Sequence, residues 1–220
     1  MTGYFVTGTD TGVGKTYIAC ALVRRAMRRG HRVFAFKPVE TGCEPGPLGD
    51  LLGADQELLA AAAGDWQTGP LRGVYRFPLP AAPRVAAEAA RGAIDLEHVL
   101  RTQRNGSTHH GASFSVIEGA GGWRVPITSD ADMSTLSRMI GFPVIAVARA
   151  GLGTINHSLL TAEAVERDGQ KLAAIVLSQR ETDDPAAARS NQAEIRRRWS
   201  GTVLIVGSDL SPLDVLLPIP

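Results

Sequence analysis

The amino-acid sequence predicts an α/β fold, with a single doubly wound, mostly parallel sheet and flanking helices. Six short apolar runs recur along the 220 residues, and most are near-continuous, as in strands buried on both faces of a parallel sheet. Helix-length stretches alternate with these runs, as in a doubly wound sheet. A chain of this length supports one hydrophobic core, so we expect a single domain over residues 1–220. The expected strands are residues 4–7, 33–36, 115–117, 144–148, 173–177 and 203–206.

Four segments are expected to be helices. In residues 15–29, Ile18, Leu22 and Ala26 share one face, arginines lie opposite, and Gly30 follows as a C-terminal stop. The other expected helices are residues 55–63, 156–167 and 184–199. Two stretches, residues 77–83 and 105–111, are expected to be loops.

Composition and charge limit the classes of function. The 23 basic and 22 acidic residues leave a formal net charge of +1, which gives no reason to expect binding to nucleic acid or anionic membranes. The N-terminus lacks the pattern of a signal peptide, and no apolar run is long enough to span a bilayer. Cys20 and Cys43 have no zinc-type spacing. We therefore expect a reduced cytoplasmic protein.

Residues 8–16 carry the strongest functional signal. They read Gly-Thr-Asp-Thr-Gly-Val-Gly-Lys-Thr, directly between the first expected strand and helix. Glycines let backbone N–H groups surround phosphates. Lys15 supplies a charge for the β- and γ-phosphates, and the Thr16 hydroxyl can ligate Mg²⁺. Five residues separate Gly8 from Gly14, where four are usual, but strand, turn, Lys-Thr pair and helix together predict a nucleoside triphosphate site.

Charged residues are expected at the same end of the sheet. Lys37 follows the second strand and Glu118 the third, and the carboxyl ends of parallel strands line the ligand crevice. An ammonium there can neutralise charge on a transferred phosphoryl group, and a carboxylate can ligate the metal. Asp55 opens a helix as either an N-cap or a metal ligand, and Asp50 is the alternative carboxylate.

A fourth segment, residues 150–157, joins the strand at 144–148 to a helix. Backbone amides at such a turn suit an anion, for instance a substrate carboxylate. A plain strand–helix connection explains the segment equally well. His157 is expected to pack or cap, and the pair His109 and His110 lies beside no Cys or Asp pattern, so no metal is assigned to it.

Together these segments resemble the dethiobiotin synthetase family, within the larger group of P-loop proteins with an extended loop. The resemblance rests on Gly-Thr-Asp-Thr-x-Val-Gly-Lys-Thr at 8–16, Lys-Pro-Val-x-Thr-Gly at 37–42, Glu-Gly-Ala-Gly-Gly at 118–122 and Leu-Gly-Thr-Ile-Asn-His at 152–157. The Pro-Ala-Ala-Pro at 80–83 is similar to the family's substrate-side segment.

The resemblance implies a P-loop NTPase-like fold, ATP and Mg²⁺ as cofactors, and a homodimer. The implied reaction closes the cyclic urea of dethiobiotin from 7,8-diaminopelargonate and CO₂, in biotin biosynthesis. A carbamate forms on one amine, ATP phosphorylates it, and the second amine attacks the mixed anhydride.

The resemblance also implies roles for individual residues. The catalytic residues would be Lys37, Lys15 and Thr11, and the metal ligands Thr16, Asp55 and Glu118. The nucleotide contacts would be Gly12, Val13, Gly14, Lys15, Thr16, Tyr17, Asp55, Glu118, Gly119, Ala120, Gly121, Ser178 and Gln179. The substrate contacts would be Thr11, Lys37, Thr41, Gly121, Gly153, Thr154, Ile155 and Asn156, the last four from the neighbouring subunit.

The chain departs from the family pattern at the nucleotide base. Ser178-Gln179-Arg180 replaces the usual Asn-Asp type sequence, residues 207–210 lack the usual Pro, and Gly12 stands where Glu is frequent. We therefore expect weaker discrimination among nucleoside triphosphates. Two alternatives stay open: a partition-type ATPase switch and an inactive nucleotide-binding regulator. Switches of that type carry a further lysine early in the loop, where this chain has Thr9 and Asp10.

Overall fold

A six-stranded sheet forms the centre of the protein. The computed structural model describes residues 2–46, 49–109 and 111–218, and of His109 only the backbone. The strand order is β10-β9-β8-β1-β7-β2, and every neighbouring pair is parallel. All six strands expected from the apolar runs are confirmed. They are β1 (Thr2–Gly8), β2 (Val33–Phe36), β7 (Phe114–Gly122), β8 (Val144–Arg149), β9 (Leu172–Ser178) and β10 (Thr202–Val206).

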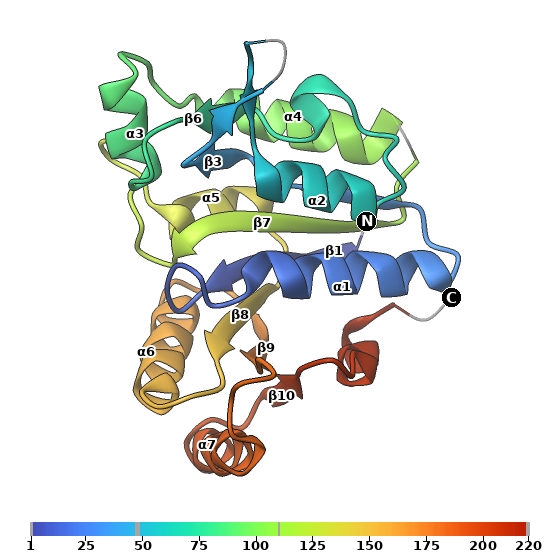
Figure 1. Ribbon diagram of the computed structural model, residues 1–220, viewed down its shortest axis with the longest axis vertical. Coiled ribbons are helices and arrows are strands. Elements are labelled where there is room, and N and C mark those ends of the chain that lie inside the picture. The colour runs from blue at the N-terminus through green and yellow to red at the C-terminus, as the bar shows by residue number, and fades with distance from the viewer. Residues whose placement is uncertain (1, 47–48, 110, 219–220) are drawn as a thin grey trace.

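Helices cover both faces of this sheet (Figure 1). Alternate residues of the strands pack against α1 (Lys15–Arg28), α2 (Ala54–Ala62) and the 3₁₀ helix η2 (Ser211–Leu216) on one face. The opposite face packs against α4 (Leu96–His109), α5 (Met133–Ile140), α6 (Thr154–Arg167) and α7 (Pro185–Arg198). The four expected helices are confirmed, and the doubly wound architecture follows from this two-sided cover.

Small elements fill the connection between β2 and β7. They are β3 (Val39–Thr41), β4 (Glu44–Pro45), β5 (Leu51–Leu52), η1 (Gly69–Leu71), β6 (Tyr75–Phe77) and α3 (Pro83–Ala89), in addition to α2 and α4. The strands β3 and β6 form a parallel pair, and β4 and β5 an antiparallel one. The Pro-rich stretch at residues 77–83 joins β6 to α3, and α3 itself was not expected.

The prediction of a loop at residues 105–111 is wrong, because α4 continues to His109. The buried hydroxyl of Ser107 donates to the carbonyl of Gln103, four residues earlier, at 2.8 Å, so this polar group is satisfied within the helix. Gly106 allows α4 to pass close to the sheet, since a Cβ there would lie 2.4 Å from the ring of Phe34. His110 lies outside the described residues.

The parallel strands all end at one edge of the sheet, where the loop before α1 also lies (Figure 1). Among the described residues, no helix combines the length and apolar character needed to cross a bilayer.

Candidate active site

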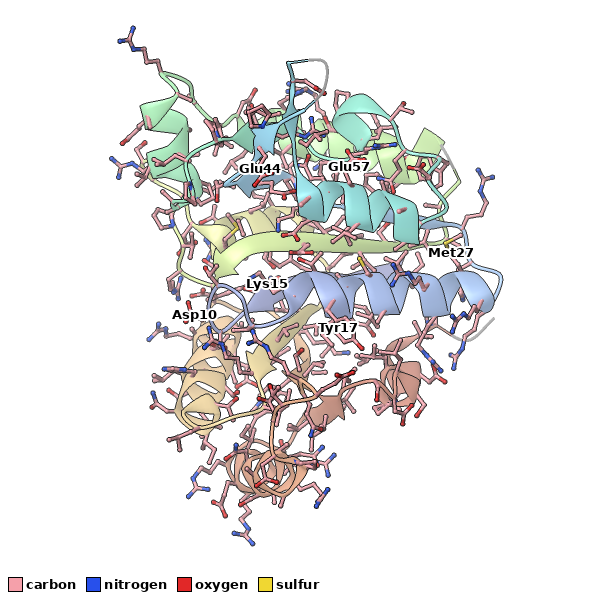
Figure 2. The ribbon with its side chains drawn as sticks, in the orientation of Figure 1. Asp10, Lys15, Tyr17, Met27, Glu44 and Glu57 are labelled. Carbon is pink, nitrogen blue, oxygen red and sulfur yellow. The ribbon has the colours of Figure 1, made fainter. Side chains whose placement is uncertain are left out.

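The loop of residues 8–16 wraps from β1 into α1. Gly12 and Gly14 adopt positive φ angles of 68° and 98°, a region that other residues rarely adopt. The N-cap of α1, Gly14, has no side chain to cap the first turn, and amides at a helix start can bind an anion. Figure 2 shows Lys15 at the start of α1 and Asp10 in the loop, and the Lys15 ammonium donates to the Asp10 carbonyl at 3.1 Å.

A cavity of about 710 Å³ opens in front of this loop. Its walls come from the phosphate loop, the ends of β2 and β7, the start of α2 and the Pro-rich stretch. They comprise Thr11, Gly12, Gly14, Lys15, Thr16, Tyr17, Lys37, Glu40, Thr41, Asp55, Pro80, Ala81, Ala82, Pro83, Glu118, Ala120, Gly121 and Val125. The structure therefore brings together most of the residues expected to act on phosphate, metal and substrate.

A buried charge cluster lies at the centre of the cavity. The Lys37 ammonium is 3.0 Å from Oε1 of Glu118 and pairs also with the Asp55 carboxylate. The Thr16 hydroxyl donates to the same Glu118 oxygen at 2.8 Å. Glu118 is fully buried, and Lys37 and Lys15 are 6% and 7% exposed. Two cations and two carboxylates thus share one site, in which Asp55 is the partly exposed member.

The two lysines differ in their electrostatic surroundings. Burial lowers the pKa of Lys15, and attraction from Glu118 only partly opposes this shift. Burial also acts to lower the pKa of Lys37, but Glu118 and Asp55 outweigh it and raise the pKa above its ordinary value. Lys37 is therefore a firmly held cation at neutral pH.

The cluster fits a magnesium ion. The second oxygen of Glu118, Oε2, is buried and has no hydrogen-bond partner in the part of the chain that the structure describes, although a buried anionic oxygen ordinarily requires one. Within the described residues, no group of three or more His, Cys, Asp or Glu side chains suits a metal. Mg²⁺ commonly binds through one or two carboxylates together with substrate phosphates, which matches Glu118, Asp55 and the Thr16 hydroxyl beside a phosphate loop.

Asp55 faces this cavity and does not cap its own helix. Gly53 is the N-cap of α2 and provides no side-chain hydrogen bond. Asp50, the alternative carboxylate, precedes β5 and does not line the cavity.

The sequence interpretation did not include Glu40, which also lines the cavity. Its two carboxylate oxygens accept hydrogen bonds from the amides of Asp55 and Gln56, each at 2.9 Å. Burial raises the pKa of Glu40, and these amide bonds oppose the shift. An acidic residue inside the Lys-Pro-Val-x-Thr-Gly segment was the one available signal. Its partners are fifteen and sixteen residues away, beyond the reach of local patterns.

Comparison with known proteins identifies the family. A family model described as an AAA domain matches residues 2–209. The ATP-dependent dethiobiotin synthetase BioD of Anaeromyxobacter dehalogenans (strain 2CP-C) is 43% identical over 199 residues, which cover 90% of this chain and 85% of that protein. The protein of the same name from Endomicrobium trichonymphae is 35% identical and covers 93% and 92%. The chain belongs to the dethiobiotin synthetase family. The resemblance predicted from the sequence is confirmed.

Solved structures confirm the fold of this family member. A chain of the MinC:MinD cell division protein complex of Aquifex aeolicus has a TM-score of 0.57 and 11% identity, covering 100% of this chain and 88% of that chain. The signal recognition particle receptor FtsY from Elizabethkingia anophelis has a TM-score of 0.55 and 14% identity, covering 97% and 61%. At such identities the likeness concerns the P-loop fold alone.

Several residues expected in the site lie outside this cavity. Val13, within the phosphate loop, has a buried side chain, and Gly119 lies against the ring of Phe5. Ser178 ends β9 and touches Gly14, where a Cβ would lie 2.4 Å from the Ser178 hydroxyl oxygen. The residues of the fourth segment, Gly153, Thr154, Ile155 and Asn156, form the start of α6 and do not line the cavity.

A second cavity of about 370 Å³ lies on the side where the nucleotide base was expected. Gln179 and Arg180 line it together with Gly207, Ser208 and Asp209. The Arg180 guanidinium donates to the Gly12 carbonyl at 2.9 Å. A residue at which this chain departs from the family sequence therefore contacts the phosphate loop. Sequence reasoning did not predict this contact.

Proposed function

We propose that this member of the family catalyses the ATP- and Mg²⁺-dependent formation of dethiobiotin from 7,8-diaminopelargonate and CO₂. The observation that carries the proposal is one cavity shared by two sets of residues. Lys15, Thr16 and Glu118, expected at the phosphates and the metal, line this cavity together with Thr41 and residues 80–83, expected at the substrate. A phosphoryl donor and a small acceptor can therefore meet inside one cavity.

The proposed reaction has three steps. One substrate amine adds to CO₂, forms a C–N bond and loses a proton, which gives a carbamate. A carbamate oxygen attacks the γ-phosphorus of ATP and breaks its bond to the bridging oxygen, so that ADP leaves and a carbamic–phosphoric anhydride forms. The second amine attacks the carbonyl carbon of this anhydride, releases inorganic phosphate and a proton, and closes the ureido ring.

Positioning and neutralisation of charge supply most of the catalysis in phosphoryl transfer. Lys15 and Lys37 neutralise charge on the transferring phosphoryl group, and Thr11 and Thr41 contact the carbamate or the diamine. Gly12, Gly14 and Tyr17 belong to the nucleotide side of the same cavity, and Ala120 and Gly121 leave room for the substrates to approach the end of β7. Four further residues stay predicted nucleotide contacts although they do not line this cavity: Val13, Gly119, Ser178 and Gln179.

Thr16, Asp55 and Glu118 hold Mg²⁺ in this proposal. The ion supplies Lewis-acid stabilisation of the phosphate oxygens. The unpartnered Oε2 of Glu118 supports this assignment, because a cation would satisfy that buried anionic oxygen. Lys37 pairs with two of the three proposed ligands, which holds their carboxylates at the cavity.

The proposal includes a cytoplasmic homodimer in which α6 serves the neighbouring site. Gly153 caps α6 with a φ of 89° and without a side-chain hydrogen bond. The Thr154 amide donates to the Gly151 carbonyl at 3.3 Å, so the amides of Ile155 and Asn156 are the ones that suit a carboxylate. Leu152 is fully exposed and Leu160 is 56% exposed beside this helix start. Apolar side chains in that position favour burial against a second copy.

The deciding experiment incubates the protein with 7,8-diaminopelargonate, bicarbonate, Mg²⁺ and ATP, and measures dethiobiotin by mass spectrometry. We expect dethiobiotin, ADP and phosphate in equal amounts. ATP hydrolysis that needs no diamine and yields no dethiobiotin would favour the partition-type switch instead. Absence of both turnover and product, with nucleotide bound, would favour the inactive regulator.

A further inference from the structure

The first turn of α2 depends on a carboxylate from another element. Gly53 provides no side-chain cap, so the N-terminal amides of α2 need other acceptors. Glu40 in β3 supplies acceptors for two of these amides, with Oε1 2.9 Å from the Asp55 nitrogen and Oε2 2.9 Å from the Gln56 nitrogen. A carboxylate at a helix N-terminus is also favoured by the helix dipole.

Two glycines make room for this arrangement. A Cβ on Gly53 would lie 2.5 Å from Oε2 of Glu40, and a Cβ on Gly73 would lie 2.0 Å from Nε2 of Gln56. Both distances are shorter than any van der Waals contact. The absence of side chains therefore lets Glu40 and Gln56 pack directly onto the backbone.

The same helix turn contacts Lys37 at two points, its backbone carbonyl and its side-chain ammonium. Gln56 is fully buried, and its side-chain nitrogen donates to the Lys37 carbonyl at 3.1 Å. Asp55, the preceding residue, pairs with the Lys37 ammonium. The carboxylate of Asp55 is 34% exposed at the cavity. Any shift of this turn would therefore displace Asp55 and loosen Lys37 together.

Glu40 also connects this turn to the substrate side of the cavity. It lies in β3 immediately before Thr41, and both residues line the cavity. A local Ser or Asp cap would satisfy the amides of α2 without fixing their distance from β3. The link through Glu40 joins the strand that carries Thr41 to the helix that carries Asp55.

We propose that Glu40 is a positioning residue, whose carboxylate holds the first turn of α2 so that Asp55 faces the metal side of the cavity. This inference rests on the proposed role of Asp55 as a metal ligand. Both Glu40 oxygens accept hydrogen bonds from backbone amides of this turn, and through these bonds Glu40 acts on the position of Asp55.

The test compares Glu40→Gln with the matched control Glu44→Gln, since Glu44 is exposed in β4. The amide exchange rates of Asp55 and Gln56 are measured by NMR. The affinity for Mn²⁺ with a non-hydrolysable ATP analogue is measured by electron paramagnetic resonance. We expect Glu40→Gln to accelerate both amides and to weaken Mn²⁺ binding about 10- to 100-fold, as is usual when the partner of a metal ligand is lost. Glu44→Gln should change neither quantity.

Two outcomes would overturn the proposal. Unchanged exchange at Asp55 and Gln56 would show that Glu40 does not hold the turn, and faster exchange with unchanged Mn²⁺ affinity would show a role in folding alone. Should Glu40→Gln not fold, Gly53→Ala pushes against the same carboxylate and must give the same two defects. Neither measurement requires product, so failure of the dethiobiotin assay in the wild-type protein is a separate result.

Discussion

Lys37 and Glu118 form a buried ion pair that connects the end of β2 to β7, with 3.0 Å between the ammonium nitrogen and Oε1. Because β2 and β7 are neighbouring parallel strands, the pair also fixes the cation next to the phosphate loop. The pKa of Lys37 is raised despite its burial. The charge needed for phosphoryl transfer is therefore present before any nucleotide binds.

Replacing Lys37 by alanine should nearly abolish turnover and leave nucleotide binding largely intact. The ammonium contributes to stabilising the transferred phosphoryl group, and loss of one such donor lowers kcat by about 10²- to 10³-fold. The measurement is steady-state production of dethiobiotin together with calorimetric binding of ATP. Lysine occurs at only three positions of the sequence, Lys15, Lys37 and the exposed Lys171, so Lys171→Ala is the matched control. Full activity of Lys37→Ala would exclude this residue from the reaction.

Gly14→Ala should destabilise the protein and damage the phosphate loop. The φ of 98° is unfavourable for alanine, and its Cβ would lie 2.4 Å from the Ser178 hydroxyl oxygen. Left-handed backbone and overpacking together cost about 2–4 kcal/mol of the free energy of unfolding, measured by urea denaturation. Adding Ser178→Gly should recover only the overpacking part.

Gly141 provides the control for that substitution. Its φ is 78°, and a Cβ there would meet nothing within 4 Å. Gly141→Ala should therefore cost only the backbone part, about 1–2 kcal/mol. Equal losses at Gly14 and Gly141 would contradict the role assigned to Ser178.

The nucleotide base should contribute less to binding than the phosphates do. The backbone N–H of Gln179 donates to the Val206 carbonyl at 2.8 Å, the Arg180 guanidinium donates to the Gly12 carbonyl, and the Asp209 carboxylate accepts from Ser211. Arg180 and Asp209 are therefore committed to contacts within the protein, and the usual Asn-Asp type sequence is absent from residues 178–180. We expect dissociation constants for ATP, CTP and GTP to agree within about tenfold, measured by competition binding. A strong preference for ATP would show that the base is recognised in another way.

The sheet and the charge cluster could be predicted because both follow from local signals combined with one topological rule. Apolar runs placed the strands, and the shared edge of parallel strands brought Lys37, Glu118 and the loop containing Thr16 together. The prediction of a loop at residues 105–111 was wrong because the polar side chain of Ser107 forms a hydrogen bond to the backbone carbonyl of Gln103 within the helix. The short helix α5, capped by Asp132, gave too little periodicity to be found.

Contacts between distant segments could not be predicted. Glu40 meets the amides of α2, and Arg180 meets Gly12 across 168 positions of sequence. Neither contact has a repeating pattern or a characteristic spacing, because each depends on how separate elements pack in three dimensions. Functional groups that act through such partners emerge only from the structure.

Asp168 should make the free energy of unfolding depend on pH in the acidic range. Asp168 ends α6, and its carboxylate accepts hydrogen bonds from Trp123 and Arg124, both at 2.8 Å. Burial alone would raise the pKa of Asp168, but these bonds outweigh it and hold the pKa below its ordinary value of 3.8. A carboxyl whose folded pKa is depressed stabilises the fold above its unfolded pKa and loses that contribution as the pH falls through the folded value.

The contribution of Asp168 should therefore be complete at neutral pH and disappear below about pH 3.8. Asp168→Asn should lower the free energy of unfolding by about 1 kcal/mol at neutral pH, since Arg124 is largely exposed. The variant should also lose less stability than the wild type on acidification, because its side chain has no proton to gain. Urea denaturation between neutral pH and about pH 3 measures both effects, with Glu44→Gln as the control. Parallel pH curves for Asp168→Asn and wild type would show that the bonds to Trp123 and Arg124 add no acid-dependent stability.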